Sequence, residues 1–326
     1  MTDRKLPGLE CALNNEVMRL RLSPGRERGR GEDAVSQVQS RILKYTPGKR
    51  CVIEYRLELG ENQHGPQRLI GKLYRKDRGQ VIFENLCNLW EAANGNERPG
   101  MYFGMPKPVA YLSDIGMVLQ GVVPGRQLST FSTPEELSAA VRYVAENLAA
   151  LHGLAVAAGE KRALHDHIKK YCHPGPRVLK AARPELAPLV ENILTALAQN
   201  EDLNRAPICP IHGDLNLAQI FITADRAFFI DLDGFCFSHA ALDVGNFLIT
   251  LKAHFGARSE ELTRIFLDGY LSHQPPQILA GLRVYQALAC LRRAVICYRL
   301  QVDADWPRQA RQLLEAGIAL FNEKPF

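Results

Sequence analysis

Short apolar runs separated by polar turns dominate the chain as far as Pro124. The pattern predicts strands at residues 42–45, 51–59, 67–74, 105–111 and 116–122. Between the third and fourth of these, Ile82, Leu86 and Leu89 recur at the helical period and predict one helix, Gln80–Ala93. The expected architecture of this part is therefore a mostly antiparallel sheet with one helix.

Two segments precede that sheet. Apolar residues of the stretch 5–22, among them Leu9, Leu13 and Leu20, fall on one helical face and predict a short amphipathic helix. The stretch 23–33 is rich in glycine and charge, so we expect an exposed connection there.

Helical periodicity takes over after Pro124. Thr133–Glu136 has the sequence of a capping box with proline at the first helical position, and it predicts a helix that ends at Gly153. Further helices are predicted near residues 185–199, 242–255, 259–272, 277–300 and 307–321. A chain of 326 residues suggests two domains at about 150 residues each, and we place them at residues 1–122 and 123–326.

One stretch interrupts the helical part with a strand pattern. Apolar strands at residues 220–223 and 227–230 are joined by a short polar turn, which predicts a β-hairpin. Its ends lie close together, so Asp214 and Gln219 at one end should lie near Asp231 and Asp233 at the other. Carboxylate and carbonyl oxygens are the ligands that Mg²⁺ prefers, and a magnesium site is therefore expected here.

A lysine stands inside the third predicted strand. Lys72 alternates in phase with Ile70 and Tyr74, so the three side chains should share one face of the sheet. A lysine on a covered face is costly unless it meets an anion. The alternative is a lysine on an edge strand that extends to water.

These groups occur in the order found in kinases. There, a strand lysine grips the phosphates, one aspartate orients the acceptor hydroxyl, an amide residue five positions later holds a metal, and an aspartate after a hairpin holds both metals. Lys72, Asp214, Gln219 and Asp231 follow that order and spacing.

On these residues the chain resembles the aminoglycoside phosphotransferase family, which is similar in fold to choline kinases and protein kinases. The likeness extends over residues 40–255, and its motifs are Gly71–Tyr74, Leu148–His152, Ile211–Leu215 with Gln219, Ile230–Asp233, and Leu242-Asp243. The resemblance implies an α+β, bilobal, protein-kinase-like fold, with a small N-terminal sheet lobe and a larger helical C-terminal lobe. It also implies an ATP- and Mg²⁺-dependent kinase that phosphorylates a hydroxyl of a small molecule.

The resemblance assigns catalytic and metal-binding roles in the second lobe. Asp214 would be the catalytic base or the group that orients the acceptor hydroxyl, and Asp231 with Gln219 would hold Mg²⁺. His212, Asp233 and Asp243 would support these loops. An alternative for Asp233 is a loop-capping role.

In the first lobe the resemblance assigns nucleotide binding. Lys72 would hold the α- and β-phosphates, with Glu84 as its ion-pair partner, although Glu91 on the same helix is an alternative. Gln120 and Val122 lie in the stretch 119–123, which would be the hinge whose backbone binds adenine.

Two departures from the family pattern leave alternatives open. Gln219 is one methylene longer than the family's Asn, and Mg²⁺ demands near-ideal geometry, so a nucleotide-binding pseudokinase with weak activity is the runner-up. The phosphate loop, residues 46–49, contains a single glycine, Gly48, whereas the corresponding loop of protein kinases is rich in glycine. A third hypothesis is a metallohydrolase that uses His212, Asp231 and His239 together with Asp214 and Asp233.

Composition limits the classes of partner that the protein is expected to bind. The net charge of +5 is too small to indicate nucleic-acid binding, and no basic stripe with interleaved aromatic residues occurs. Eight cysteines without a Cys-x-x-Cys pair are typical of reduced thiols in a cytoplasmic protein. No signal-peptide pattern or apolar run long enough to span a membrane is present in the sequence, so no membrane partner is expected.

The acceptor and the oligomeric state stay open at this stage. A sugar, an amino alcohol, an aminoglycoside or another metabolite would each suit the family, and the protein is expected to be a monomer or a homodimer. Arg292 and Arg299 lie two helical turns apart; we favour solvated side chains, and the alternative is that they face an anionic acceptor.

Overall fold

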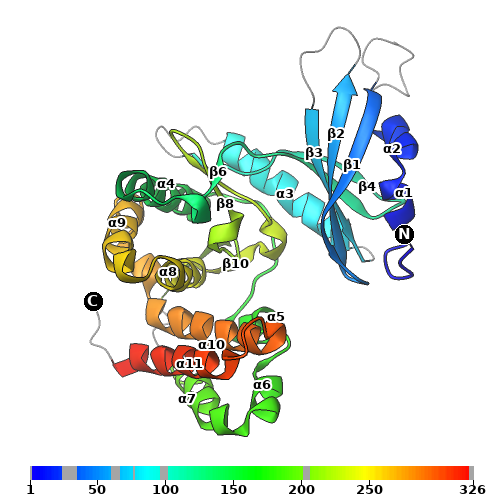
Figure 1. Ribbon diagram of the computed structural model, residues 1–326. Coiled ribbons are helices and arrows are strands. Elements are labelled where there is room, and N and C mark those ends of the chain that lie inside the picture. Colours follow the sequence, from blue (N-terminus) through cyan, green and yellow to red (C-terminus); the bar gives the residue numbers. More distant parts are fainter. Residues whose placement is uncertain are drawn as a thin grey trace. The chain divides into compact units, whose positions relative to one another are not determined.

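The computed structural model describes residues 2–23, 35–59, 67–75, 78–95, 102–200 and 206–322. The chain divides into two compact units (Figure 1). Unit 1 comprises Met1–Gly95 with Met105–Pro124, and unit 2 comprises Asn96–Gly104 with Gly125–Phe326. Unit 1 is built on a sheet and unit 2 is mainly helical, so the predicted α+β class is confirmed.

A five-stranded antiparallel sheet forms the centre of unit 1. Its strand order is β1-β2-β3-β5-β4. The strands are β1 Val35–Thr46, β2 Arg50–Leu59, β3 Gln67–Tyr74, β4 Pro108–Leu112 and β5 Met117–Gly121. All five predicted strands are therefore present, but β1 is much longer than expected and β4 begins three residues later than the sequence predicts.

The chain passes from unit 2 into unit 1 between Gly104 and Met105, shortly before β4. Within unit 2, Gly104 N donates a hydrogen bond to Asn147 Oδ1 (2.7 Å). The carbonyl of the same glycine accepts from Phe229 N (2.9 Å).

The two faces of this sheet carry different helices (Figure 1). The helix α3, Arg78–Gly95, packs on one face against β3, β4 and β5, as the sequence predicts. On the other face lie two short helices, α1 Leu9–Leu13 and α2 Asn15–Leu22. This second face is the apolar core of unit 1, and its members include Leu6, Leu9, Met18, Ile53, Tyr55, Leu73 and Met117.

The single helix expected at residues 5–22 is wrong. Asn14 has an extended backbone, and its side chain accepts hydrogen bonds from Glu16 N and Val17 N, so it caps a new helix instead of continuing the old one. The break rotates the buried face: Met18 is buried, whereas Leu20 is 40% exposed. The stretch 24–34, which contains most of the expected connection, lies outside the described residues.

Unit 2 combines helices with two small sheets. The helices are α4 Pro134–His152, α5 Leu164–Tyr171, α6 Pro176–Ala182, α7 Ala187–Ala198, α8 Ala241–Phe255, α9 Ser259–Leu271, α10 Leu282–Leu300 and α11 Trp306–Asn322. One sheet pairs β7 Ile208–Ile211 with β10 Cys236–His239, and the other has the order β6-β8-β9, with β6 Arg126–Gln127, β8 Ile220–Ile222 and β9 Ala227–Phe229. The predicted hairpin, now β8–β9, is confirmed; α5, α6, β6, β7 and β10 were not predicted.

Two predicted helix starts differ in detail. Thr133 forms no side-chain cap to the backbone; its hydroxyl donates to Glu136 Oε2 (3.1 Å) instead, so the expected capping box is absent although α4 is present. The helix expected from residue 277 begins as a 3₁₀ turn, Pro276–Leu279. The regular helix starts only after Gly281, whose φ is +76°.

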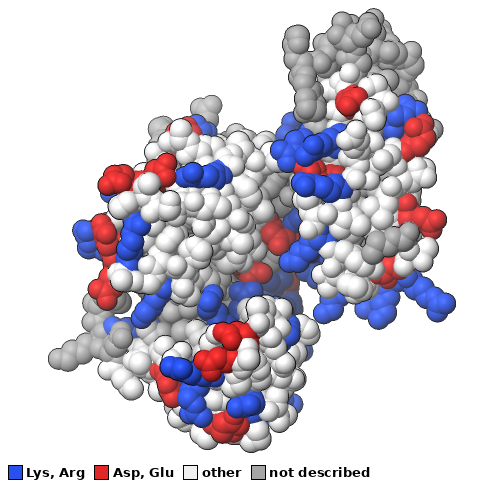
Figure 2. Space-filling view, in the orientation of Figure 1, with Lys and Arg blue, Asp and Glu red and all other residues white. Residues whose placement is uncertain are grey.

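Surface charge, helix apolarity and the cysteines bear on the partners that the sequence predicts. On the face that Figure 2 shows, basic and acidic side chains are interspersed over the helical unit. Among the described residues, no helix combines the length and apolarity that spanning a bilayer requires. All eight cysteines are free thiols, and five of them are buried.

Candidate active site

The hairpin β8–β9 brings two of the predicted metal ligands together. Ile220 pairs with Phe229, and just beyond this pair Ile230 N donates to the carbonyl of Gln219 (2.9 Å). Gln219 and Asp231 therefore stand at the same end of the hairpin. Asp231 has a left-handed backbone with φ +64°, which costs about 1–3 kcal/mol for a residue other than glycine and is concentrated at functional sites.

The loop that carries Asp214 lies directly on the turn after the hairpin. Gly213 has φ +78°, and a Cβ on it would come within 2.3 Å of the carbonyl oxygen of Gly234. Only glycine fits this approach. The contact places Asp214 beside the 3₁₀ turn Leu232–Gly234 that follows Asp231. The two aspartates that the sequence predicts to meet are thus brought together.

Asp243 holds this loop from below. It is 1% exposed on α8, and its Oδ2 and Oδ1 accept hydrogen bonds from His212 N (2.6 Å) and Gly213 N (2.9 Å). His152 Nε2 lies 3.4 Å from Oδ2, and the other ring nitrogen of His152 is 2.6 Å from the hydroxyl of Tyr270. Buried polar groups linked in this way rigidify a site, because each depends on its partner.

His212 connects the same loop to the hairpin. Its side chain is fully buried, and its Nε2 donates to the carbonyl of Ile230 (2.9 Å), directly before Asp231. The ring also packs edge-on against Phe229, at 6.3 Å between ring centroids. His212 and Asp243 thus both bond to the backbone of the loops that carry Asp214 and Asp231.

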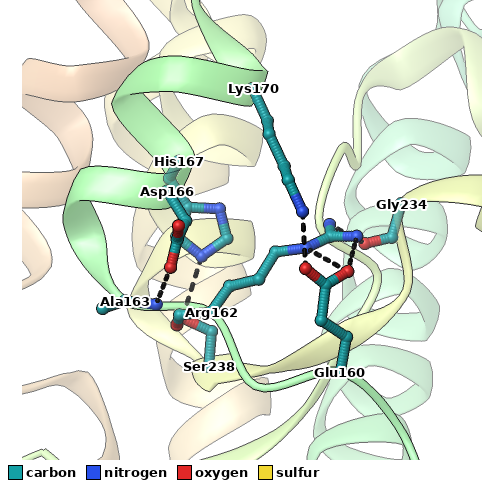
Figure 3. A network of polar contacts seen from close by, with 8 residues as sticks. All are labelled: Glu160, Arg162, Ala163, Asp166, His167, Lys170, Gly234 and Ser238. Carbon is teal, nitrogen blue, oxygen red and sulfur yellow. Dashed lines mark hydrogen bonds and ion pairs between the residues drawn. The ribbon is translucent and has the colours of Figure 1, made fainter.

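A second network fixes the turn itself (Figure 3). Arg162 donates from one terminal nitrogen to the carbonyl of Gly234 (2.9 Å) and from Nε and the other terminal nitrogen to Glu160 Oε2 (3.0 and 2.7 Å). Lys170 pairs with the remaining oxygen of Glu160 at 2.5 Å. Chiefly because of Arg162, the pKa of Glu160 falls to about 2. None of these three residues is indicated by the sequence pattern, since Glu160 and Arg162 lie in the irregular stretch before α5, and α5, which carries Lys170, was not predicted.

The carboxylate of Asp214 has an unexpected partner. Arg292 on α10 forms an ion pair with Asp214 Oδ1, and its guanidinium lies 3.7 Å from the ring centroid of Tyr171. Burial raises the pKa of Asp214, the neighbouring Arg292 and His212 oppose this, and the negative charge of Asp231 adds to the rise. The expectation of a solvated side chain is therefore wrong for Arg292, which is 16% exposed, whereas Arg299 is exposed.

The predicted nucleotide-binding residues lie in unit 1. Lys72 is 5% exposed on β3, which has β2 on one side and β5 on the other. The alternative of an edge-strand lysine is therefore wrong. A Cβ on Gly71 would meet Tyr55 and Met117 in the apolar core, so Lys72 faces the opposite side of the sheet, the side that carries α3.

Other residues of unit 1 complete this picture. Glu84 is exposed on α3 and accepts a hydrogen bond from Gln80 Nε2 (2.9 Å). Gln120 is 4% exposed on β5 and pairs with Ile70, two positions before Lys72, so it shares the face of the lysine. Val122, just after β5, is 38% exposed.

The residues at the hairpin fit a magnesium ion of the kind expected with a nucleotide. Mg²⁺ in such sites is held by one or two carboxylates together with phosphate oxygens and water. Asp231 supplies a carboxylate, and Gln219 next to it supplies an amide. Gln219 Oε1 already accepts a hydrogen bond from Asn216 N (3.0 Å), which leaves it one lone pair for a metal.

The metallohydrolase hypothesis finds no matching side-chain set. Among the residues that the structure describes, no three His, Cys, Asp or Glu side chains form a metal-binding group. Both candidate histidines are engaged elsewhere, His212 with Ile230 and His239 through its Nδ1 with the hydroxyl of Tyr285 (2.9 Å).

Solved structures with the same fold include kinases of small molecules. A choline kinase from Cryptosporidium parvum is 14% identical, with a TM-score of 0.62 over 96% of this chain and 95% of that one. A thermostable mutant of aminoglycoside phosphotransferase APH(4)-Ia is 16% identical, with a TM-score of 0.60 over 89% and 97%. The ADP-bound aminoglycoside phosphotransferase APH(2'')-Ib is 15% identical, with a TM-score of 0.56 over 87% and 94%. No curated protein matches the sequence.

The fold is of the protein-kinase-like class that these small-molecule kinases share. The model of the Phosphotransferase enzyme family matches residues 64–288, and the chain belongs to this family. The prediction of an enzyme of the small-molecule kinase class is thereby confirmed.

Proposed function

We propose that the protein transfers the γ-phosphoryl group of ATP to a hydroxyl of a small molecule. The observation that carries the proposal is the junction of Asp214 with Asp231 in a loop cluster fixed by Asp243. Phosphoryl transfer uses two carboxylates with different tasks: one orients the acceptor hydroxyl, and the other binds the metal.

Each residue has a proposed part in the reaction. Asp214 accepts the hydrogen bond of the acceptor hydroxyl and takes its proton as the new O–P bond forms, while the bond between the γ-phosphorus and the β-phosphate oxygen of ATP breaks and ADP leaves. Lys72 holds the α- and β-phosphates, with Glu84 as its partner, and the backbone at Gln120 and Val122 binds adenine. These are the nucleotide functions that we assign to residues 1–122, and the acceptor belongs to residues 123–326.

A magnesium ion would be held by Asp231 and Gln219. When bound, it neutralises charge on the β- and γ-phosphates. Three residues support this arrangement. His212 and Asp243 fix the loop of Asp214 by hydrogen bonds between their side chains and backbone groups. Asp233 lies in the turn that Gly213 contacts.

The test is the substitution Asp214→Asn. ATP consumption would be followed with magnesium and a panel of sugars, amino alcohols and aminoglycosides, and nucleotide binding would be measured by calorimetry. Loss of an acid–base group costs about 10²–10⁴-fold in rate, and we expect that loss in turnover with ATP affinity nearly unchanged. Asp225→Asn, an exposed aspartate in the β8–β9 turn, is the matched control and should retain full activity. Normal turnover of Asp214→Asn would refute the assignment.

A second candidate, a pseudokinase that binds nucleotide with weak turnover, is favoured by one observation. The side-chain oxygen of Gln219 serves the loop by accepting from Asn216 N, so it is less available to a metal than a free amide. The substitution Gln219→Asn separates the two functions. A large gain in rate from a low starting value would identify a weakened enzyme, whereas high activity of the unchanged protein would exclude the pseudokinase.

A further inference from the structure

A cavity lies beside the loop of Asp214. Its volume is about 360 Å³, within the lower range of small-molecule sites. Asn216, two residues after Asp214, lines it together with Asn246 and Thr250 of α8. From α10 come Arg292 and Arg293.

Positive charge and polar side chains line the cavity beside apolar residues such as Leu217 and Ile296. Two arginines and two asparagines face it, and His254 also lines it, with its Nε2 3.1 Å from the carbonyl of Ser129. Among the described residues that line the cavity there is no Asp or Glu. Such a lining disfavours a polycationic acceptor, because like charges placed together in a partly buried site repel.

Arg292 is placed at the edge between this cavity and Asp214. Its guanidinium is packed over Tyr171 at 3.7 Å, and its ion pair to Asp214 uses one terminal nitrogen. Its Nε is buried and makes no hydrogen bond. An arginine presents five donors in a planar fork, so its second terminal nitrogen can bind a ligand while the first holds Asp214.

Placing Arg292 beside Asp214 makes Asp214 a weaker catalytic base. A cation beside a carboxylate lowers its pKa and weakens it as a proton acceptor. The cost is offset if the same guanidinium also binds the acceptor, because it then fixes the acceptor hydroxyl next to Asp214. Arginine suits this task when the acceptor carries a planar or tetrahedral oxyanion.

We infer that the acceptor is a small hydroxylated anion, bearing a carboxylate or a phosphate group that Arg292 binds in this cavity. The inference rests on the proposed function, and it adds the charge class of the substrate. Arg293 contributes a second positive charge to the same cavity. The side-chain amides of Asn216 and Asn246 donate to the carbonyls of Asp214 and Leu215 and so hold the loop of Asp214 beside the cavity. Arg292 is a binding and positioning residue, while Asp214 takes the proton.

The test uses simple anions and the full chain without nucleotide. Inorganic phosphate and acetate represent the two possible groups, and each is titrated by calorimetry against sodium chloride at the same ionic strength. We expect one of them to bind, and the one that binds identifies the group. Arg292→Met should abolish this binding, and Arg292→Lys, which keeps the charge without the fork, should weaken it by about tenfold.

Two control variants make every outcome decisive. Arg299→Met, on the same helix but exposed, should leave anion binding unchanged. Lys72→Met should also leave it unchanged, because the phosphate-binding lysine belongs to a different proposed site. Binding that survives Arg292→Met or is lost in Lys72→Met would overturn the inference, and so would the absence of binding by either anion. Because no nucleotide is present, these results stand apart from a failure of the kinase assay.

Discussion

The buried carboxylate of Asp243 allows a quantitative test of how the catalytic loop is held. Substitution Asp243→Ala removes the acceptor of His212 N and Gly213 N, at 2.6 and 2.9 Å. Each backbone N–H left buried without a partner costs about 1–3 kcal/mol, so we expect a loss of about 4 kcal/mol in the free energy of unfolding. Asp243→Asn keeps one acceptor oxygen, and its loss should be about half as large.

Urea unfolding of both variants measures this loss, and steady-state ATP consumption measures the effect on Asp214. Turnover should fall even at temperatures where the variants remain folded, because a displacement of about 1 Å at a reacting group can cost about 10²-fold in rate. Asp225→Ala, at the exposed turn of the same hairpin, should change neither quantity. A loss of less than about 1 kcal/mol for Asp243→Ala would show that the loop does not depend on this carboxylate.

Three further predictions concern pH and backbone strain. Burial raises the pKa of Asp214, and only the ionised carboxylate accepts a proton, so as the pH falls kcat/KM should begin to decline at a higher pH than it would with an ordinary aspartate. Arg292→Met removes the cation that lowers this pKa and should move the start of the decline to a still higher pH. An unchanged pH profile of kcat/KM in Arg292→Met would contradict this prediction. Burial lowers the pKa of His167 from 6.5 to about 4, so stability present above pH 6.5 is lost as the pH falls towards 4; His167→Gln should remove about 2 kcal/mol of the loss between pH 7.5 and 5 in urea titrations. Gly213→Ala should abolish turnover and destabilise the fold, measured by thermal unfolding, whereas Gly256→Ala, also at positive φ but with open space, should cost only the backbone strain.

The sequence predicted the site well where its signals were local. The β8–β9 hairpin fixes which residues meet at its ends, and both its strands and its turn are contiguous in the chain. Lys72 was placed correctly on a covered strand for the same reason, since alternation along β3 is a local pattern. The strands β7 and β10 escaped prediction because they pair with each other across a long stretch of chain, Cys236 with Ile211, and no local turn links them.

The partners of these residues were beyond sequence reasoning. Arg292 meets Asp214 across 78 positions, and Arg162 meets Gly234 across 72. An arginine at helical spacing carries the same pattern whether it is solvated or buried, and only the packing of α10 decides between them. The helix break at Asn14 was missed for a different reason, since Asn14 is compatible with a helix interior but gains two hydrogen bonds by capping.

Several features of this site lower the stability of the fold, and that loss bears on whether the site is active. A left-handed Asp231, two neighbouring carboxylates and a buried Arg292 Nε without a hydrogen bond each lower stability. The networks of Asp243 and Arg162 offset these costs by fixing the backbone on both sides of the pair. Strain supported in this way is expected where charged groups must be held ready for a ligand. Because similarity at about 15% identity shows the fold alone, it is this arrangement of residues that argues for chemistry at Asp214.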